Sequence, residues 1–96
     1  MFEEFYKEVG ARLRDARISQ LKTQLEVAER LGFARQNVSL MEKGQRQLDI
    51  ALFVKWCDVL NIDPNALIKE TRKYLYKWVF KKTKTGIWFN TRIMIR

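Results

Sequence analysis

The segment 31–44, LGFARQNVSLMEKG, combines hydrogen-bonding side chains with apolar residues at near-helical spacing. In a short helix the apolar residues would face a core and the polar residues would face outward. The inward side would hold Phe33, Val38 and Met41, and the outward side Arg35, Gln36, Ser39 and Leu40. An Arg guanidinium can donate two hydrogen bonds to guanine, and a Gln amide can pair with adenine, at base edges in the major groove of DNA. Recognition of bases is therefore one interpretation of this face, and an ordinary solvated surface is the other.

The composition excludes the commonest catalytic chemistries. The chain has no His and a single cysteine, Cys57, which excludes His-dependent catalysis, a Cys/His metal site and an internal disulfide. It also has no clustered carboxylates, no phosphate-binding loop and no nucleophile motif. We therefore predict that the protein is not an enzyme and needs no cofactor or metal, and that Cys57 is a small core residue.

Positive charge is concentrated at one end of the chain. The formal net charge is +8, yet residues 1–68 hold ten Lys or Arg and ten Asp or Glu. Residues 69–96 hold nine Lys or Arg and one acid, Glu70. We predict a domain over 1–68 followed by a basic extension over 69–96. The acidic N-terminal stretch does not resemble a signal peptide, and no apolar run reaches the ~20 residues of a membrane span, so we expect a soluble protein in the cytoplasm.

Two helices are predicted before the segment 31–44. Apolar spacings of three and four indicate an amphipathic helix over about 2–18, in which Gly10 is a tolerated weak point. Thr23 and Glu26 have the spacing of a capping box that opens a second helix, and Gly32 ends it. The inward face of the second helix would hold Leu25, Ala28 and Leu31.

Three further helices complete the predicted domain. The third covers about 35–43 and stops at Gly44, Asp49 caps the fourth, and Asp63 with Pro64 opens the fifth. Five short helices with brief connections predict an all-α fold. Its second and third helices, joined by a tight turn, form a helix-turn-helix arrangement.

The basic extension has a different periodicity. Aromatic and β-branched residues alternate with others, which is the period of a strand, and we predict β structure over 86–95. For 70–82 two structures fit the pattern. One is a strand that would complete a hairpin, and the other is a continuation of the fifth helix to about residue 80.

Three segments carry a family resemblance: LRDAR, TQLEVAERLGFARQNVSLMEKGQR and ALFVKWCDVLNIDPNAL. Through them the sequence from about residue 9 to 67 resembles the phage-repressor/Cro-type (XRE-type) helix-turn-helix family, without a gap in the central segment. It implies a five-helix, lambda-repressor-like domain whose third helix enters the major groove. It also implies a sequence-specific, dimeric regulator of transcription on a double-stranded DNA operator, expected to be a repressor.

The resemblance assigns roles to individual positions. The positions that match base-contacting residues are Arg35, Gln36, Ser39 and Leu40. Those that match contacts to the DNA backbone are Thr23, Gln24, Asn37, Lys43 and Arg46, and Gln24 also matches a residue that braces the base reader. Arg17 and Glu42 match a partly buried ion pair between the first and third helices.

The sequence departs from the family pattern at three places, of which QLD alters the loop before the fourth helix and the other two concern the third helix. Ala34 occupies the N-cap of the third helix, where Ser or Thr is common, so this cap is missing or is supplied elsewhere. Leu40 occupies the place of a polar base reader; contact with a thymine methyl and a simple surface role are both compatible with leucine.

Partners follow from the same resemblance. Relatives commonly pair through the fourth and fifth helices, where this chain has Phe53, Trp56, Ile62, Leu67 and Ile68; a core role is the alternative. A strand in the extension would offer an edge for pairing with a second copy. The extension could instead follow DNA phosphates, bind an anionic membrane or only aid solubility. The alternative function is that of an antitoxin that binds a toxin protein and represses its own operon.

Overall fold

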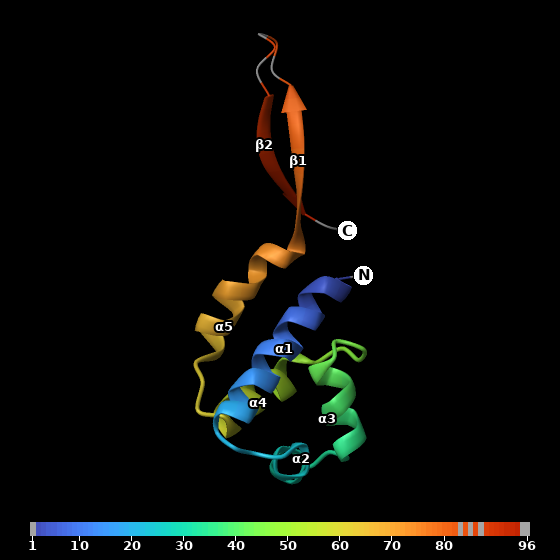
Figure 1. Cartoon of the computed structure of the whole chain (residues 1–96), viewed down its shortest axis with the longest axis vertical. Coiled ribbons are helices and arrows are strands. Elements are labelled where there is room, and N and C mark those ends of the chain that lie inside the picture. Colours follow the sequence, from blue (N-terminus) through green and yellow to red (C-terminus); the bar gives the residue numbers. More distant parts are fainter. Residues whose placement is uncertain (1, 83, 85, 87, 95–96) are drawn as a thin grey trace.

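The protein folds into five α-helices followed by a C-terminal hairpin (Figure 1). The computed structural model describes residues 2–82, 84, 86 and 88–94. The helices are α1 (Glu3–Ser19), α2 (Gln24–Leu31), α3 (Arg35–Glu42), α4 (Ile50–Val59) and α5 (Pro64–Thr71). A 3-10 turn, η1 (Arg72–Leu75), then leads into strands β1 (Tyr76–Lys82) and β2 (Trp88–Met94). The predicted all-α domain of five helices is confirmed. None of the helices in the described part of the chain combines the length and apolarity needed to cross a membrane.

Local signals set the helix boundaries as predicted. The Thr23 hydroxyl accepts a hydrogen bond from the Glu26 backbone N–H at 3.1 Å, and the Glu26 carboxylate accepts one from the Thr23 N–H at 3.2 Å, which completes the capping box. Gly32 ends α2 in the left-handed conformation, with φ of 75°. Asp49 caps α4 by accepting from the Leu52 N–H at 2.8 Å, and Asp63 caps α5 in the same way.

The core lies between α1, α2, α3 and α4 and is closed by α5. It is built around Trp56 and Leu13, both fully buried, with Val27, Ala28, Leu31, Val38, Met41, Phe53, Leu60 and Leu67. Cys57 also lies in this core, as predicted, and burial raises the pKa of its thiol to about 11, with smaller contributions from Asp58 and Asp63. The thiol is therefore neutral and unreactive near neutral pH.

Two residues expected in the core are exposed. Leu25 is 53% exposed and Phe33 is 37% exposed, so both expectations are wrong. The buried stripe of α2 follows Val27, Ala28 and Leu31, and Leu25 lies about a third of a turn away from it. Phe33 lies in the turn between α2 and α3, before the third helix sets its inward face.

Gly10 is a point of close helix contact rather than a tolerated weak point. A Cβ atom at Gly10 would lie 2.3 Å from the Met41 carbonyl oxygen and 2.7 Å from that of Glu42. At Gly44, where φ is 73°, a Cβ would lie 2.5 Å from the Lys7 Cα. Two glycines therefore let α1 run directly against the C-terminal end of α3.

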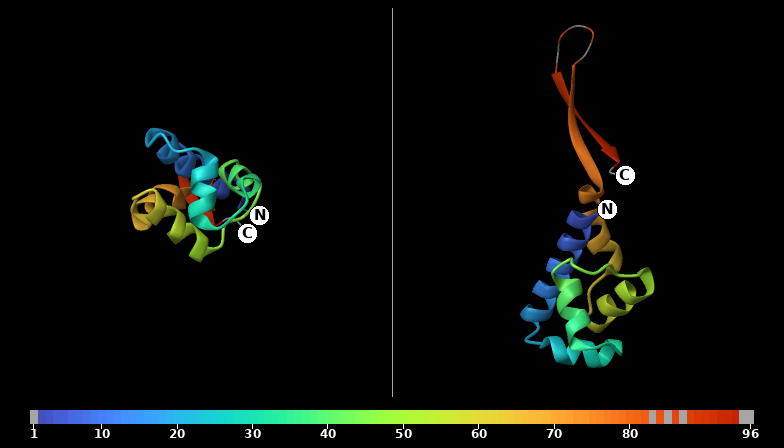
Figure 2. Two further views of the ribbon diagram at one scale, coloured as in Figure 1. Left: turned by 90° about the horizontal axis from the view of Figure 1, so that it is seen from below. Right: turned by 90° about the vertical axis from the view of Figure 1, so that its right-hand side faces the viewer.

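The hairpin resolves the two structures that fitted residues 70–82. Helical structure ends at Leu75, so a continuation of the helix to residue 80 is wrong, and β1 pairs with β2 in antiparallel register from Tyr76–Met94 to Lys82–Trp88. The predicted β structure of 86–95 is confirmed for β2, while residues 87 and 95 lie outside the described part of the chain. The hairpin projects beyond η1, and the chain measures 59 × 22 × 20 Å (Figures 1 and 2).

Candidate nucleic-acid interface

Helices α2 and α3 lie at the end of the molecule opposite the hairpin (Figures 1 and 2). The left-handed Gly32 turns the chain sharply, and the Phe33 N–H donates to the Ala28 carbonyl at 3.0 Å, which closes the turn. Val38 and Met41 then fix α3 to the core. The result is a short helix whose other side is free to face a partner.

The exposed side of α3 carries the residues predicted to read bases. Arg35, Gln36 and Leu40 are exposed, and Ser39 is half-buried. Leu40 is 39% exposed, so this leucine has no core role. An Arg and a Gln side by side on an exposed helix can hydrogen-bond to base edges.

A chain of hydrogen bonds connects Arg35 to the interior. The Arg35 guanidinium donates to the Gln24 side-chain oxygen at 3.1 Å, and the Gln24 amide donates to Glu42 Oε1 at 3.0 Å. Glu42 in turn accepts two hydrogen bonds from Arg17, at 2.7 and 3.0 Å, and Arg17 donates a third to the Lys22 carbonyl at 2.9 Å. We name these four side chains the Arg17–Arg35 relay. It links α1, the start of α2 and both ends of α3.

The other flank of α3 has its own polar contact. Arg46, in the loop after α3, donates a hydrogen bond to the Asn37 side-chain oxygen. Arg46 and Lys43 are exposed, as is Thr23 at the start of α2. The residues assigned to backbone contact therefore lie on both sides of the exposed face of α3, which is where the two strands of a duplex would run if the helix entered the major groove.

Lys7 and Arg14 are not among the residues predicted from the sequence, and the structure brings both to the same region. Both are exposed on α1 and line a cleft of about 660 Å³ that Gln24, Ser39 and Lys43 also line. Their position could have been predicted from the sequence, because residues 7, 14 and 17 lie along one face of a helix. Arg17 was already expected to face the third helix, so Lys7 and Arg14 should lie near that helix too.

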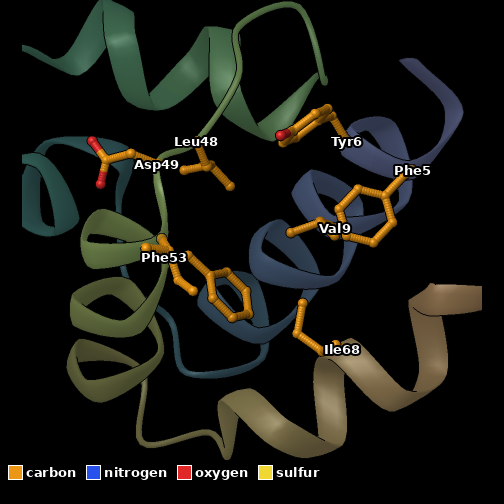
Figure 3. Close-up of a pocket in the computed structure, with 8 residues that line it drawn as sticks. Phe5, Tyr6, Val9, Leu48, Asp49, Phe53 and Ile68 are labelled. Carbon is orange, nitrogen blue, oxygen red and sulfur yellow. The ribbon is translucent and has the colours of Figure 1, made fainter. Parts of the chain in front are cut away.

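A second, apolar pocket of about 230 Å³ lies among α1, α4 and α5 (Figure 3). Phe5, Val9, Phe53 and Ile68 converge on it, and Leu48 closes it from the loop before α4. Of the five residues expected either to pair two copies or to fill the core, Phe53, Trp56 and Leu67 are buried, Ile62 packs partly against the core and Ile68 is 38% exposed. Among the described residues no group of three or more His, Cys, Asp or Glu side chains could hold a metal ion.

Comparison with known proteins points to one family. A family model described as helix-turn-helix matches residues 13–67, which is more than half of the chain. No curated protein sequence is significantly similar to the chain.

Several solved structures have the same fold. The restriction-modification controller protein C.AhdI from Aeromonas hydrophila is 31% identical over 65% of this chain and 94% of its own, with a TM-score of 0.61. An XRE-family like protein from Pseudomonas syringae pv. tomato str. DC3000 is 33% identical over 72% of this chain and 84% of its own, with a TM-score of 0.64. The controller protein C.Esp1396I, solved as a tetramer with its natural 35 base-pair operator, is 18% identical over 73% of this chain and 92% of its own, with a TM-score of 0.62, a likeness that concerns the fold alone.

Proposed function

The chain belongs to the XRE-type helix-turn-helix family, and we propose that it is a sequence-specific repressor of transcription that binds its operator as a homodimer. It is a DNA-binding regulator rather than an enzyme. The observation that carries the proposal is the exposed face of α3, on which Arg35 and Gln36 stand beside the start of α2 and Arg35 is hydrogen-bonded to Gln24.

In the proposed complex α3 lies in the major groove. Arg35 donates to guanine and Gln36 pairs with adenine, while Ser39 and Leu40 meet the next bases along the groove. The relay supports this role, because a guanidinium held by Gln24 is aimed before DNA arrives and loses less side-chain freedom on binding.

Contacts to the DNA backbone set the register of α3. Thr23 and Gln24 lie at the N-terminal end of α2, where backbone N–H groups and the helix dipole favour a phosphate. Asn37 and Arg46, which are hydrogen-bonded to each other, are proposed to meet the other strand, and Lys43, which lines a cleft with Gln24, is proposed to meet the strand on the Gln24 side. These contacts add affinity and salt dependence without reading sequence.

Dimerisation is proposed because a single short helix covers too few base pairs for high specificity. Two copies would place their α3 helices in successive major-groove segments, roughly 34 Å apart. The operator-bound tetramer of C.Esp1396I is a protein of the same fold assembled from several copies. Repression is the simpler mode of action, because a dimer on its operator excludes other proteins from the same DNA.

A toxin-binding role is not put forward. None of the three solved proteins described above is named as an antitoxin, and two of them are named restriction-modification controller proteins.

The test is selection of bound sites from a random duplex pool with wild type, Arg35→Ala and Gln36→Ala. We expect a two-fold symmetric motif with wild type and a relaxed preference at one defined position in each variant, a loss of about 1–3 kcal/mol of discrimination per base. Arg30→Ala is the matched control, since Arg30 is exposed at the far end of α2 from Gln24. A pool without enrichment, or the same motif in all four proteins, would contradict base reading by α3.

A further inference from the structure

A cleft lies between α1 and α3, on the side of α3 that is nearest to Gln24. Its volume is about 660 Å³, and its lining includes Lys7 and Arg14 from α1 and Ser39 and Lys43 from α3 and its C-cap. Because Gln24 and Ser39 also belong to the face proposed to meet DNA, the cleft continues that face rather than forming a separate site.

The charges on the walls of this cleft do not cancel. The one acid among its lining residues is Glu42, whose two carboxylate oxygens are taken up by Arg17 and Gln24. Lys7, Arg14 and Lys43 are exposed, and none of them forms an ion pair within the part of the chain that the structure describes. Three unpaired cations therefore surround one neutralised ion pair, and the cleft suits an anion.

The backbone fixes where these cations stand. Gly10 and Gly44 allow α1 to touch the end of α3 without intervening side chains, which brings Lys7 next to the chain at Gly44. Lys7 and Arg14 are two helical turns apart on the same face of α1, about 10 Å along its axis. At that separation the two side chains can reach separate phosphates along a nucleic-acid strand.

We infer that the cleft between α1 and α3 binds the sugar-phosphate backbone of the DNA strand beside the recognition helix, with Lys7 and Arg14 as additional phosphate-contacting residues. This inference rests on the proposed function, which it extends from α2 and α3 to α1. The alternative role of Lys7 is to stabilise the C-terminal end of α3, where the helix dipole attracts a cation. In that role Lys7 would affect the stability of the free protein rather than DNA binding.

The test measures the salt dependence of DNA binding for the full chain and its variants Lys7→Gln, Arg14→Gln and the double variant. Fluorescence anisotropy with the selected duplex, from about 50 to about 300 mM salt, gives the slope of log K against log salt concentration. Each single variant is expected to reduce the magnitude of the slope by about 1 and the double variant by about 2, with base preference unchanged. Arg30→Gln, with the same change of charge at the far end of α2, should keep the wild-type slope.

The charge-retaining variant Lys7→Arg separates phosphate contact from a loss of folding, and it should keep the wild-type slope. Slopes for Lys7→Gln and Arg14→Gln equal to those of wild type and Arg30→Gln would overturn the inference while leaving the proposed function intact. If the wild type selects no motif, the proposed function fails. In that case the salt-dependence slopes of the same variants, measured with a duplex of arbitrary sequence, still decide whether the cleft contacts phosphates.

Discussion

At the scale of single residues, one buried carboxylate performs two tasks. Glu42 holds Arg17 from α1 through two hydrogen bonds and holds Gln24 from α2 through a third. The side chains of Arg17 and Glu42 are only 10% and 1% exposed, so solvent screens this pair weakly. The same carboxylate therefore joins three helices and, through Gln24, fixes the direction of Arg35.

Breaking the pair from one side should destabilise the protein strongly. Glu42→Leu leaves the Arg17 charge buried without its partner, and we expect a loss of about 3–5 kcal/mol in the free energy of unfolding, measured by urea denaturation. Arg17→Met should cost a similar amount for the same reason.

The double variant Arg17→Met/Glu42→Leu should recover most of that loss, because no buried charge remains. Its site preference should still be relaxed at the base assigned to Arg35, since Gln24 has lost its acceptor. Losses that simply add in the double variant would show that the two side chains do not act as a pair.

Gly10 gives a prediction in which the sign of the effect is decisive. Gly→Ala inside an exposed helix usually stabilises by about 1 kcal/mol. At Gly10 the added methyl would overlap the carbonyl oxygens of Met41 and Glu42, so we expect a loss of about 1–3 kcal/mol or more in the free energy of unfolding. A variant as stable as wild type in urea would mean that α1 and α3 are not in such close contact.

At the scale of secondary structure, α3 is held by its neighbours rather than by its own ends. The helix has eight residues, and an isolated helix of this length is not stable in water. Its N-cap, Ala34, has no side chain that can accept a hydrogen bond, so the cap that the family usually supplies is missing. Packing of Val38 and Met41, together with the relay, has to compensate.

Restoring the missing cap should stabilise the protein. Ala34 already has the extended conformation of an N-cap, with φ of −73° and ψ of 146°, so Ala34→Ser requires no change of the backbone. We expect a gain of about 1 kcal/mol, seen as a higher melting temperature by circular dichroism. Thr23→Ala, which removes the existing cap of α2, should lower stability by a similar amount and serves as the reference; an unchanged melting temperature for Ala34→Ser would contradict the prediction.

At the scale of the whole molecule, the segment that carries the excess charge and helix α3 lie toward opposite ends. Residues 69–96 carry the whole excess positive charge, and they include β1 and β2, the strands of the hairpin that extends away from α2 and α3 (Figure 2). A two-stranded hairpin is marginally stable alone and leaves both edges open to pairing. The division into a domain over 1–68 and an extension over 69–96 stays a prediction, and so does the role of the hairpin in dimerisation.

Removal of the hairpin tests that role. A variant that ends at Leu75 keeps all five helices and η1, and we expect it to be monomeric at concentrations at which wild type is dimeric by light scattering. Ile50→Ser is the comparison variant, because Ile50 is 82% exposed on α4, one of the two helices through which relatives are expected to pair. A dimer that survives the deletion but not Ile50→Ser would assign the interface to α4 and α5.

The sequence by itself determined where the five helices begin and the order in which they follow, but not where the fifth helix ends. Thr23, Gly32, Asp49 and Asp63 act on backbone groups within four residues of themselves, so their effects can be predicted without knowledge of the fold. The outward position of Arg35 and Gln36 was predictable for the same local reason, namely the helical spacing of Val38 and Met41. The pairing of Arg17 with Glu42 came from family resemblance and not from spacing.

Only the tertiary structure decided which side chains meet across the chain. The need for glycine at position 10, the relay through Gln24 and the cleft that Lys7 and Arg14 line together with Ser39 all depend on how closely α1 approaches α3. The exposure of Leu25 likewise depends on which stripe of α2 packs against the other helices, and that of Phe33 on where α3 begins. Such contacts join residues far apart in sequence, and their geometry is set by the packing of whole helices, which no local pattern of residues encodes.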